Sequence, residues 1–490
     1  MLFNSFEFIF LFLPITFILY YLLLHNRLFM GAKAILVVAS LFYYAWWKLE
    51  YLPVILLTLI FNYVIGNLLS RADFRKSLSR KGTLIFGIFI NIALLGYYKY
   101  SNFLIDNINA LTQSSIGMVE LSLPLAISFF TFTQIAYLID CYKGDVKEYD
   151  FVNYSLFVTF FPHLLAGPIV HHKEMMPQFS SKWNYAMKHK NIAVGLFLFS
   201  IGLFKKVVIA DTFSGWANLG FDKAEYLNMI EAWVTSLSYT FQLYFDFSGY
   251  TDMALGVALL FNIRLPINFN SPYKAVDIKD FWRRWHITLS RFMRDYIYIP
   301  LGGNRFGNYR TYNNLIITFV IGGLWHGAGW TFLFWGALHG LALSVHRFWN
   351  GLGLRMPRYL AWFVTFNFVN VGWVFFRANT WDDAIKVIKG MFMGDFILSE
   401  GWIDRLGFLQ EYGVQFGQRL IHLGGSSTPL AWLIVAFIII SLKNSNQLAK
   451  NFISNYKHFI ATVLLGVRRT RESSRRGSHP ARSGSRGFSC

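Results

Sequence analysis

The amino-acid sequence predicts an all-α, polytopic integral membrane protein. Of its 490 residues, 55% are hydrophobic and only 14% are charged, whereas a soluble domain has about 25% charged residues. Because side chains that face lipid are costly to charge, this shortage is typical of a chain embedded in a membrane. Apolar runs also recur along the sequence, at close to the roughly 20 helical residues that cross a hydrocarbon core.

These apolar runs are the expected membrane helices. In chain order they are Phe6–Leu24, Met30–Trp47, Tyr51–Ser70, Gly82–Tyr98, Leu121–Ile139, Phe151–Val170, Ile192–Ala210, Ala232–Phe247, Tyr250–Ile263, Asn313–Leu324, Trp330–Phe348, Tyr359–Phe376 and Pro429–Leu442, with a fragment at Phe459–Leu465. The first run lacks a basic n-region and a cleavage site, so we expect a retained span rather than a signal peptide. Several runs are short, and we therefore expect about 11–13 transmembrane or re-entrant helices.

The pattern divides the chain into four regions. Residues 1–120 are expected to form N-terminal transmembrane helices, residues 121–378 a core, and residues 379–466 a polar loop followed by C-terminal helices. Residues 467–490 are rich in Arg and Ser and have no apolar periodicity. Such a tail cannot bury enough apolar surface to fold, so we expect it to be disordered. A frameshift, a truncated gene or added residues would explain it equally well.

The net charge of +19 comes from Lys and Arg between the apolar runs. This distribution follows the positive-inside rule and suits anionic lipid or a phosphorylated ligand, and it argues against nucleic-acid binding. With two cysteines in the whole chain, we expect neither a disulfide framework nor a metal site. One basic cluster predicts a cytoplasmic loop and consists of Arg71, Arg75, Lys76, Arg80 and Lys81.

His326 is the most informative single position. It ends an apolar run in the segment IGGLWHGAGWTFLFWGALHG, and an ionisable side chain at membrane depth is a functional candidate because it is costly. An imidazole accepts and returns a proton near neutral pH, which suits a general base. The surrounding glycines leave room for a substrate or another backbone. A hydrogen-bonded packing histidine is the alternative, and the residues alone leave both open.

The long segment 264–312 contains the second candidate, His286, within FWRRWHITLSRFMRDYIYIPLGGNR. Its aromatic residues alternate with arginines, which predicts amphipathic or half-inserted helices at the cytoplasmic face. The guanidinium groups of Arg283 and Arg284 match phosphate geometry. The alternative is that this segment only anchors the chain in the lipid headgroups.

Acidic and amide side chains form a third group in YTFQLYFDFSGYTDMALG. Gln242 and Asp246 share one helix face, and Ser248-Gly249 offers a break before Asp252. We expect the carboxylates to be paired structurally, with arginines of the following segment as partners, rather than to be catalytic. Lys205 and Lys206, which end an earlier apolar run, are expected to extend toward the membrane interface.

The remaining histidines are weaker candidates. His339 and His346 are seven residues apart on one run, so they could face one cavity, although packing is the simpler interpretation. Three more flank the segment AGPIV, in which Pro168 predicts a helix end. They are His163, His171 and His172.

Taken together, the motifs resemble the membrane-bound O-acyltransferase family, in particular its alginate and peptidoglycan O-acetylation branch. The matching stretches are MLFNSFEFIFLFLPI, FFPHLLAGPIV, GLFKKVVIAD, QLYFDFSGYTDMALG, NFNSPY, DFWRRWHITLSRFMRDYIYIPLGGNR and GGLWHGAGWTFLFWGALHG. They are long, ordered and specific, and they extend to about Arg377. The basic tail departs from the family pattern, in which a further apolar span usually closes the chain.

The resemblance implies a ring of helices around a central funnel, with residues 264–312 as a re-entrant segment at the cytoplasmic side of the 121–378 catalytic core. It makes His326, the histidine of the WHG motif, the expected catalytic residue. His286, the histidine of the WRRWH motif, is the expected second one. No cofactor is expected to be permanently bound, and acetyl-CoA is the implied donor. Arg283 and Arg284 are our candidates for its phosphates.

The implied function is the movement of acetyl from cytoplasmic acetyl-CoA across the bacterial inner membrane. There it would serve O-acetylation of an envelope polysaccharide, peptidoglycan or alginate. The implied partners are a periplasmic SGNH-type O-acetyltransferase and membrane lipid. Two alternatives stay open: a conduit for acetyl groups that makes no bond itself, and D-alanyl transfer to teichoic acid.

Overall fold

The computed structural model describes residues 1–71, 79–146 and 150–452. The chain divides into two compact units, Met1–Asn444 and Ser445–Cys490. The second unit is described only over the helix Ser445–Phe452. Arg75 and Lys76 of the predicted cytoplasmic loop, the fragment at Phe459–Leu465 and the tail 467–490 lie outside the described residues.

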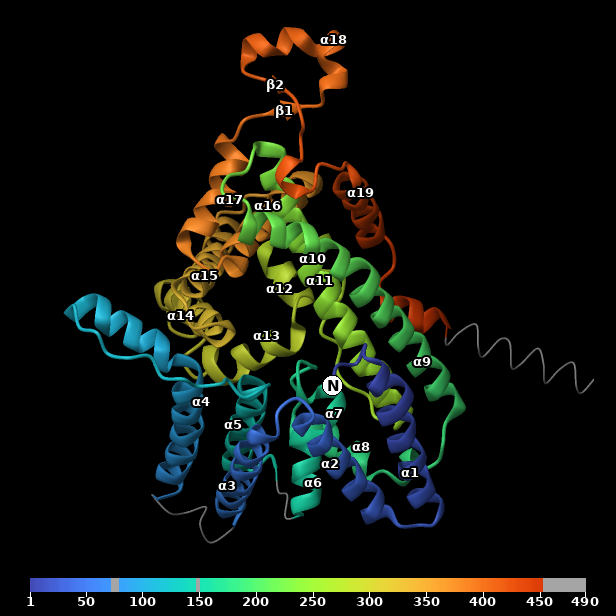
Figure 1. The fold of residues 1–490 in the computed structure, drawn as a ribbon. Coiled ribbons are helices and arrows are strands. Elements are labelled where there is room, and N and C mark those ends of the chain that lie inside the picture. Colours follow the sequence, from blue (N-terminus) through green and yellow to red (C-terminus); the bar gives the residue numbers. More distant parts are fainter. Residues whose placement is uncertain (72–78, 147–149, 453–490) are drawn as a thin grey trace, which may run out of the picture. The chain divides into compact units, whose positions relative to one another are not determined.

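The first unit is built from helices, some of them short 3-10 or π helices with η labels (Figure 1). Its N-terminal part comprises η1 (Phe8–Phe12), α1 (Leu13–His25), α2 (Phe29–Ala45), η2 (Leu49–Tyr51), α3 (Leu52–Ser70), α4 (Ser79–Thr112), α5 (Ile127–Lys143), α6 (Phe151–Thr159), α7 (Phe161–Leu164), α8 (His172–Ser180) and η4 (Lys182–Asn184). Its middle comprises α9 (His189–Phe204), η5 (Lys205–Ala210), α10 (Asp211–Asn218), η6 (Leu219–Lys223) and α11 (Met229–Leu260).

The part that follows contains the candidate site. Its elements are η7 (Pro272–Lys274), α12 (Ile278–Arg284), α13 (Ile287–Met293), η8 (Arg294–Tyr298), α14 (Gly307–His326), α15 (Trp330–Gly351) and α16 (Arg358–Arg377). The last elements are α17 (Trp381–Met393), β1 (Ile397–Leu398), η9 (Glu400–Trp402), α18 (Ile403–Leu406), η10 (Gly407–Tyr412), β2 (Gln415–Phe416), η11 (Ile421–Leu423) and α19 (Thr428–Ser441). The strands β1 and β2 pair in parallel over two residues each.

The all-α polytopic membrane class is confirmed. Within the described residues, five helical stretches are long and apolar enough to cross a bilayer. They are Phe8–His25, Leu49–Ser70, Ser79–Thr112, His189–Lys223 and Arg358–Arg377. The other helices are shorter or more polar, so the count of about 11–13 transmembrane or re-entrant helices stays a prediction.

One expected break does not exist. The runs Ala232–Phe247 and Tyr250–Ile263 form a single helix, α11, which passes through Gly249 without interruption. This glycine serves close packing instead: α9 lies beside α11 (Figure 1), and a Cβ at Gly249 would stand 2.7 Å from the carbonyl oxygen of Gly202. Small residues at such a crossing allow two membrane helices to approach each other closely.

The segment after α11 has one buried face. In the short helices α12 and α13, Phe281, Trp285 and Phe292 are almost fully buried within the protein, whereas Lys279 and Arg283 are exposed. Phe281 and Trp285 belong to a core that also contains Trp335 and Trp373. These aromatic side chains pack within the protein and contribute to the candidate site, while the expected amphipathic, re-entrant placement of residues 264–312 at the cytoplasmic side stays a prediction.

Candidate active site

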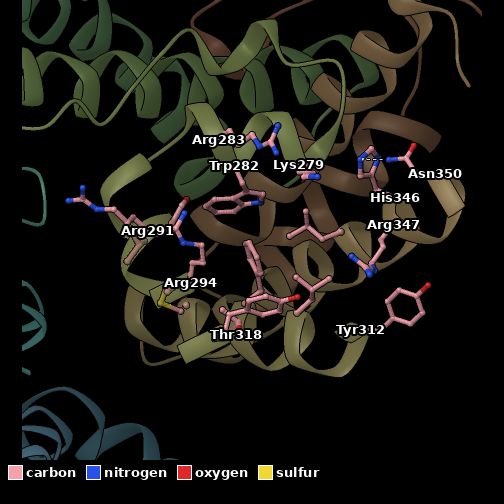
Figure 2. Close-up of a pocket in the computed structure, with 18 of the residues that line it drawn as sticks. Lys279, Trp282, Arg283, Arg291, Arg294, Tyr312, Thr318, His346, Arg347 and Asn350 are labelled. Atoms are coloured by element: carbon pink, nitrogen blue, oxygen red, sulfur yellow. Dashed lines mark hydrogen bonds between the residues drawn. The ribbon is translucent and has the colours of Figure 1, made fainter. Parts of the chain in front are cut away.

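A cavity of about 1050 Å³ is lined by residues of α12, α13, η8, α14 and α15 (Figure 2). Its lining includes Asn308 in the first turn of α14 and His326 at the end of that helix. Since a helix rises about 1.5 Å per residue, the cavity extends roughly 27 Å along α14. It therefore connects two distant ends of the helix pair.

The tight contact between α14 and α15 explains how the cavity is formed. A Cβ at Gly336 of α15 would lie 2.3 Å from the carbonyl oxygen of Phe319, and a Cβ at Gly340 would lie 2.6 Å from the Cα of Ile316. The two backbones thus touch along one face. Of the glycines near His326, Gly323 makes a similar close contact with the backbone of Phe332, and Gly322 lines the cavity; room for a substrate there stays a prediction.

One end of the cavity is basic. Lys279 and Arg283 of α12 and Arg347 of α15 all line it, beside His346 and Asn350 (Figure 2). Within the described chain, none of these three cations forms an ion pair with another residue, and no described lining residue is Asp or Glu. Clustered cations without acidic partners favour an anionic ligand group such as a phosphate.

Two further arginines line the cavity but have local partners. Arg291 makes a bidentate ion pair with Glu174, at 2.6 and 2.9 Å. Arg294 pairs with Asp295 at 2.7 Å. Their charges are partly compensated, so the uncompensated positive charge is concentrated at Lys279, Arg283 and Arg347.

His326 lies at the other end of the cavity. It is the last residue of α14, and its ring is surrounded by Trp325, Trp335 and Phe376, with ring centroids 4.8, 5.3 and 5.0 Å away. The side chain is half-buried and lines the cavity. Because aromatic walls exclude water, an imidazole here is well suited to proton transfer with a ligand in the cavity.

His286 occupies the N-cap position of α13 with a left-handed backbone, at φ +41°. It is 2% exposed, and its ring centroid lies 6.5 Å from that of His326. Its Nδ1 atom is buried without a hydrogen-bond partner among the described residues, as are ring nitrogens of His163 and His339, so it is the closeness of His286 to His326 that makes it a candidate. The structure thus brings together the two histidines that are 40 positions apart in the sequence, although His286 is not itself a lining residue.

The two candidate arginines are separated by the geometry. Arg283 lines the cavity. Arg284 instead forms an i,i+4 ion pair with Asp280 at 2.8 Å and donates to the carbonyl oxygen of Asn270, and it is not a lining residue. Adjacent helix positions point in directions about 100° apart, and of this pair only Arg283 faces the cavity.

The carboxylates of α11 are paired, as expected, but with other partners. Asp252 binds Lys205 at 2.7 Å, and Asp246 binds Lys206 at 2.7 Å. Both lysines belong to η5, which runs beside α11, so the arginines of the following segment are not the partners. The lysines are ion-paired rather than simply extended to the interface. Gln242 lies on the same helix and is not a lining residue.

The other histidines fall into two groups. His346 lines the basic end of the cavity, bonded to Asn350 at 2.9 Å. His339 is fully buried and interacts with the indole nitrogen of Trp282 at 3.3 Å, so it is a core residue. The three histidines that flank AGPIV are buried and do not line the cavity.

Sequence reasoning missed Lys279, Arg347 and Asn308 as cavity residues. Arg347 follows His346 at the end of an apolar run, where a cation is usually read as an interface anchor. Because α15 runs back along α14, Arg347 lies at the same end of the cavity as Lys279 and Asn308. Within the described residues, no three His, Cys, Asp or Glu side chains are arranged to hold a metal ion.

A family model described as MBOAT, membrane-bound O-acyltransferase family, matches residues 10–380. The chain belongs to the membrane-bound O-acyltransferase family. It is therefore an acyltransferase of a membrane-bound type, and the matched range includes both His286 and His326.

Named relatives in the family agree with this membership. The chain is 49% identical to a peptidoglycan O-acetyltransferase of Helicobacter pylori, over 94% of this chain and 93% of the relative. It is 40% identical to a probable alginate O-acetylase AlgI of Pseudomonas aeruginosa, over 89% of this chain and 81% of the relative. A teichoic acid D-alanyltransferase of Streptococcus thermophilus is 32% identical over 46% of this chain and 57% of the relative.

Proposed function

We propose that this protein takes acetyl groups from acetyl-CoA at the cytoplasmic face of the bacterial inner membrane for O-acetylation of peptidoglycan. The observation that carries the proposal is the cavity itself, which joins a cluster of uncompensated cations to His326. A donor with phosphates at one end and a thioester at the other matches both ends of this cavity.

The basic end is suited to the phosphates of the donor. Lys279, Arg283 and Arg347 offer one ammonium and two guanidinium groups, which bind phosphate oxygens through charge-assisted hydrogen bonds. Arginines and aromatic residues at the same opening also suit a planar nucleobase, because guanidinium groups and rings stack. The pantetheine arm would follow α14 toward its C-terminal end.

The histidine end is suited to acyl transfer. The attacking hydroxyl, proposed to belong to the partner transferase that later passes the acetyl group to the sugar, must lose its proton as its oxygen bonds to the thioester carbon, and His326 is the proposed base that accepts it. The C–S bond then breaks, and the departing thiolate takes up a proton to leave as free CoA. The developing oxyanion needs hydrogen-bond donors, and His286, with its buried polar nitrogen beside this ring, is our candidate for polarising the carbonyl or orienting the donor.

The choice of peptidoglycan rests on the relatives rather than on the cavity. The Helicobacter pylori protein with that name shares more identity with this chain, over more of its length, than the alginate or teichoic acid proteins named above. Alginate is the nearest alternative acceptor. The proposal includes a periplasmic SGNH-type O-acetyltransferase, which would complete the transfer to the sugar hydroxyl.

Binding of coenzyme A to the purified protein tests the donor assignment. Arg283→Met should weaken binding about 10-fold or more, because it removes one charge-assisted phosphate contact. Arg284→Met should bind as the parent protein does, since Arg284 faces Asp280 and not the cavity. Arg305→Met, an exposed arginine outside the cavity lining, is the matched control.

Isothermal titration with coenzyme A gives the affinities of all four proteins. Equal binding by the Arg283 variant and the control would contradict a phosphate site in this cavity. A loss of binding in the Arg284 variant alone would place the phosphate site on the face of α12 that carries Arg284.

A further inference from the structure

Lys99 is a partly buried lysine of α4, one residue beyond the apolar run Gly82–Tyr98. A cation partly withdrawn from water needs hydrogen-bond partners. Its ammonium group donates to the backbone carbonyl oxygen of Trp325 and to Ser128 Oγ of α5, the latter at 3.2 Å. The mechanism described above does not use this residue.

These bonds are made at the last turn of α14, immediately before His326. Tyr100, the next residue of α4, donates its hydroxyl to the carbonyl oxygen of Leu324 at 2.5 Å. The indole nitrogen of Trp325 in turn donates to the carbonyl oxygen of Ser128 at 3.3 Å. The end of α14 is therefore tied to α4 and α5 by three hydrogen bonds from side chains (α4, α5 and α14 in Figure 1).

The physical reason for such a tie is the exposed end of the helix dipole. The last four carbonyl groups of an α-helix have no partner within the helix, and a cation near them is favourable. After His326 the chain continues through Gly327 and Gly329, which restrain the backbone little. Without an external donor, the last turn and the imidazole on it would be poorly fixed.

We propose that Lys99 is a positioning residue for the reaction: its ammonium group fixes the C-terminal turn of α14 and thereby aims the His326 imidazole into the cavity. Tyr100 supports the same turn through the preceding carbonyl group. This inference rests on the proposed function of His326 as the base. It goes beyond that function because Lys99 lies on another helix and does not line the cavity.

The test uses permeabilised cells that produce the full chain and are supplied with radiolabelled acetyl-CoA. The initial rate of base-labile acetate incorporation into peptidoglycan is measured against donor concentration and divided by the amount of membrane-inserted protein. Lys99→Met should lower kcat on the order of 10²-fold and leave KM for acetyl-CoA within about twofold, because misplacing a catalytic group affects the transition state more than donor binding.

Two further variants separate positioning from general stability. Lys99→Arg keeps a cation and several donors, so it should recover most of the lost kcat. Lys33→Met is the control, since Lys33 is a partly buried lysine of α2 whose amino group bonds to Asn153 at 2.9 Å, far from α14 in the sequence. It should leave both kinetic constants unchanged.

The results also distinguish the two proposals. A Lys99→Met protein with the parent kcat, or an Arg variant as inactive as the Met variant, would overturn the positioning role. If His326→Ala, measured alongside, retained the parent rate, the proposed function would fail first. An inactive His326 variant beside a fully active Lys99→Met variant would overturn only the inference drawn here.

Discussion

His286 combines three properties that rarely occur together. Its backbone is left-handed, its side chain is 2% exposed, and its Nδ1 atom has no hydrogen-bond partner among the described residues. A left-handed non-glycine residue costs about 1–3 kcal/mol, and such costs are concentrated at functional sites. An orphaned buried nitrogen adds to that cost. Ring nitrogens of His163 and His339 are also without a partner among the described residues, so the left-handed backbone and the closeness to His326 are what distinguish His286.

Replacement of His286 by Asn separates its backbone from its imidazole. Asn tolerates the left-handed region almost as well as His, so His286→Asn should accumulate in membranes like the parent protein. Acetyl transfer should fall on the order of 10²-fold, because the imidazole is lost. Immunoblots of membranes and acetyl-ester assays measure the two effects. Valine is β-branched and unsuited to positive φ, so His286→Val should also accumulate to a lower level in the membrane. Parent-level activity in the Asn variant would show that the imidazole has no role.

The long helices α9 and α11 pack against each other through close backbone contacts, which the sequence shows only as scattered glycines. On α9 and α11, Gly202 faces Gly249 and Gly195 faces Gly256, and a Cβ at any of the four would lie 2.5–2.7 Å from the opposite carbonyl oxygen. The ion pair of Lys205 with Asp252 lies beside the first of these contacts. Close backbone contact and a buried ion pair therefore both stabilise the helix pair. Adding a single methyl group at one of these glycines should lower the stability of the protein.

A pair of glycine substitutions tests this account of helix packing. Gly249→Ala places a methyl group against the α9 backbone and should destabilise the protein by about 1–3 kcal/mol, as overpacking does. Gly215→Ala adds the same methyl group on α10, where nothing lies within 4 Å, and should be neutral or stabilising because Ala is the better helix former. Melting temperatures of the detergent-purified proteins give the comparison. Equal values would contradict the close contact.

Much of the molecule was predictable because hydrophobic runs and ordered motifs report directly on membrane helices and family. The runs Tyr51–Ser70 and Trp330–Phe348 match α3 and α15 closely. The continuity of α11 was not predictable, because a glycine that permits close packing looks the same in sequence as one that ends a helix. The sequence also could not show which of Arg283 and Arg284 lines the cavity, or that Arg347 lies at the same opening. Both depend on how α12, α14 and α15 are arranged in space.

The position of the basic end of the cavity predicts how the whole chain is oriented in the membrane. The basic end of the cavity, with Lys279 and Asn308, should face the cytoplasm, where positive residues are favoured and acetyl-CoA is made. α15 ends at Gly351 beside this opening, and α16 is a candidate span. Residues after Arg377, such as the exposed Tyr412, should then lie on the periplasmic side.

Single cysteines at Lys279, Asn308 and Tyr412 test this orientation, in a chain whose Cys141 and Cys490 are replaced by Ala. All three native positions are exposed. A membrane-impermeant maleimide should label the cysteine at 412 in spheroplasts and those at 279 and 308 only in inverted vesicles. The reverse pattern would place the cavity opening in the periplasm, where no acetyl-CoA is expected, and would rule out uptake of the donor from the cytoplasm.

We propose His326, at the end of the cavity opposite the cations, as the base for acetyl transfer. The most direct test of this proposal is the amount of acetyl ester on peptidoglycan isolated from cells whose only copy of this protein is His326→Ala, with an immunoblot of the membranes. Because His326→Ala removes the proposed base, acetyl esters should fall to the level of a deletion strain while the protein still accumulates in the membrane. Parent-level esters in that variant would show that His326 is not the base.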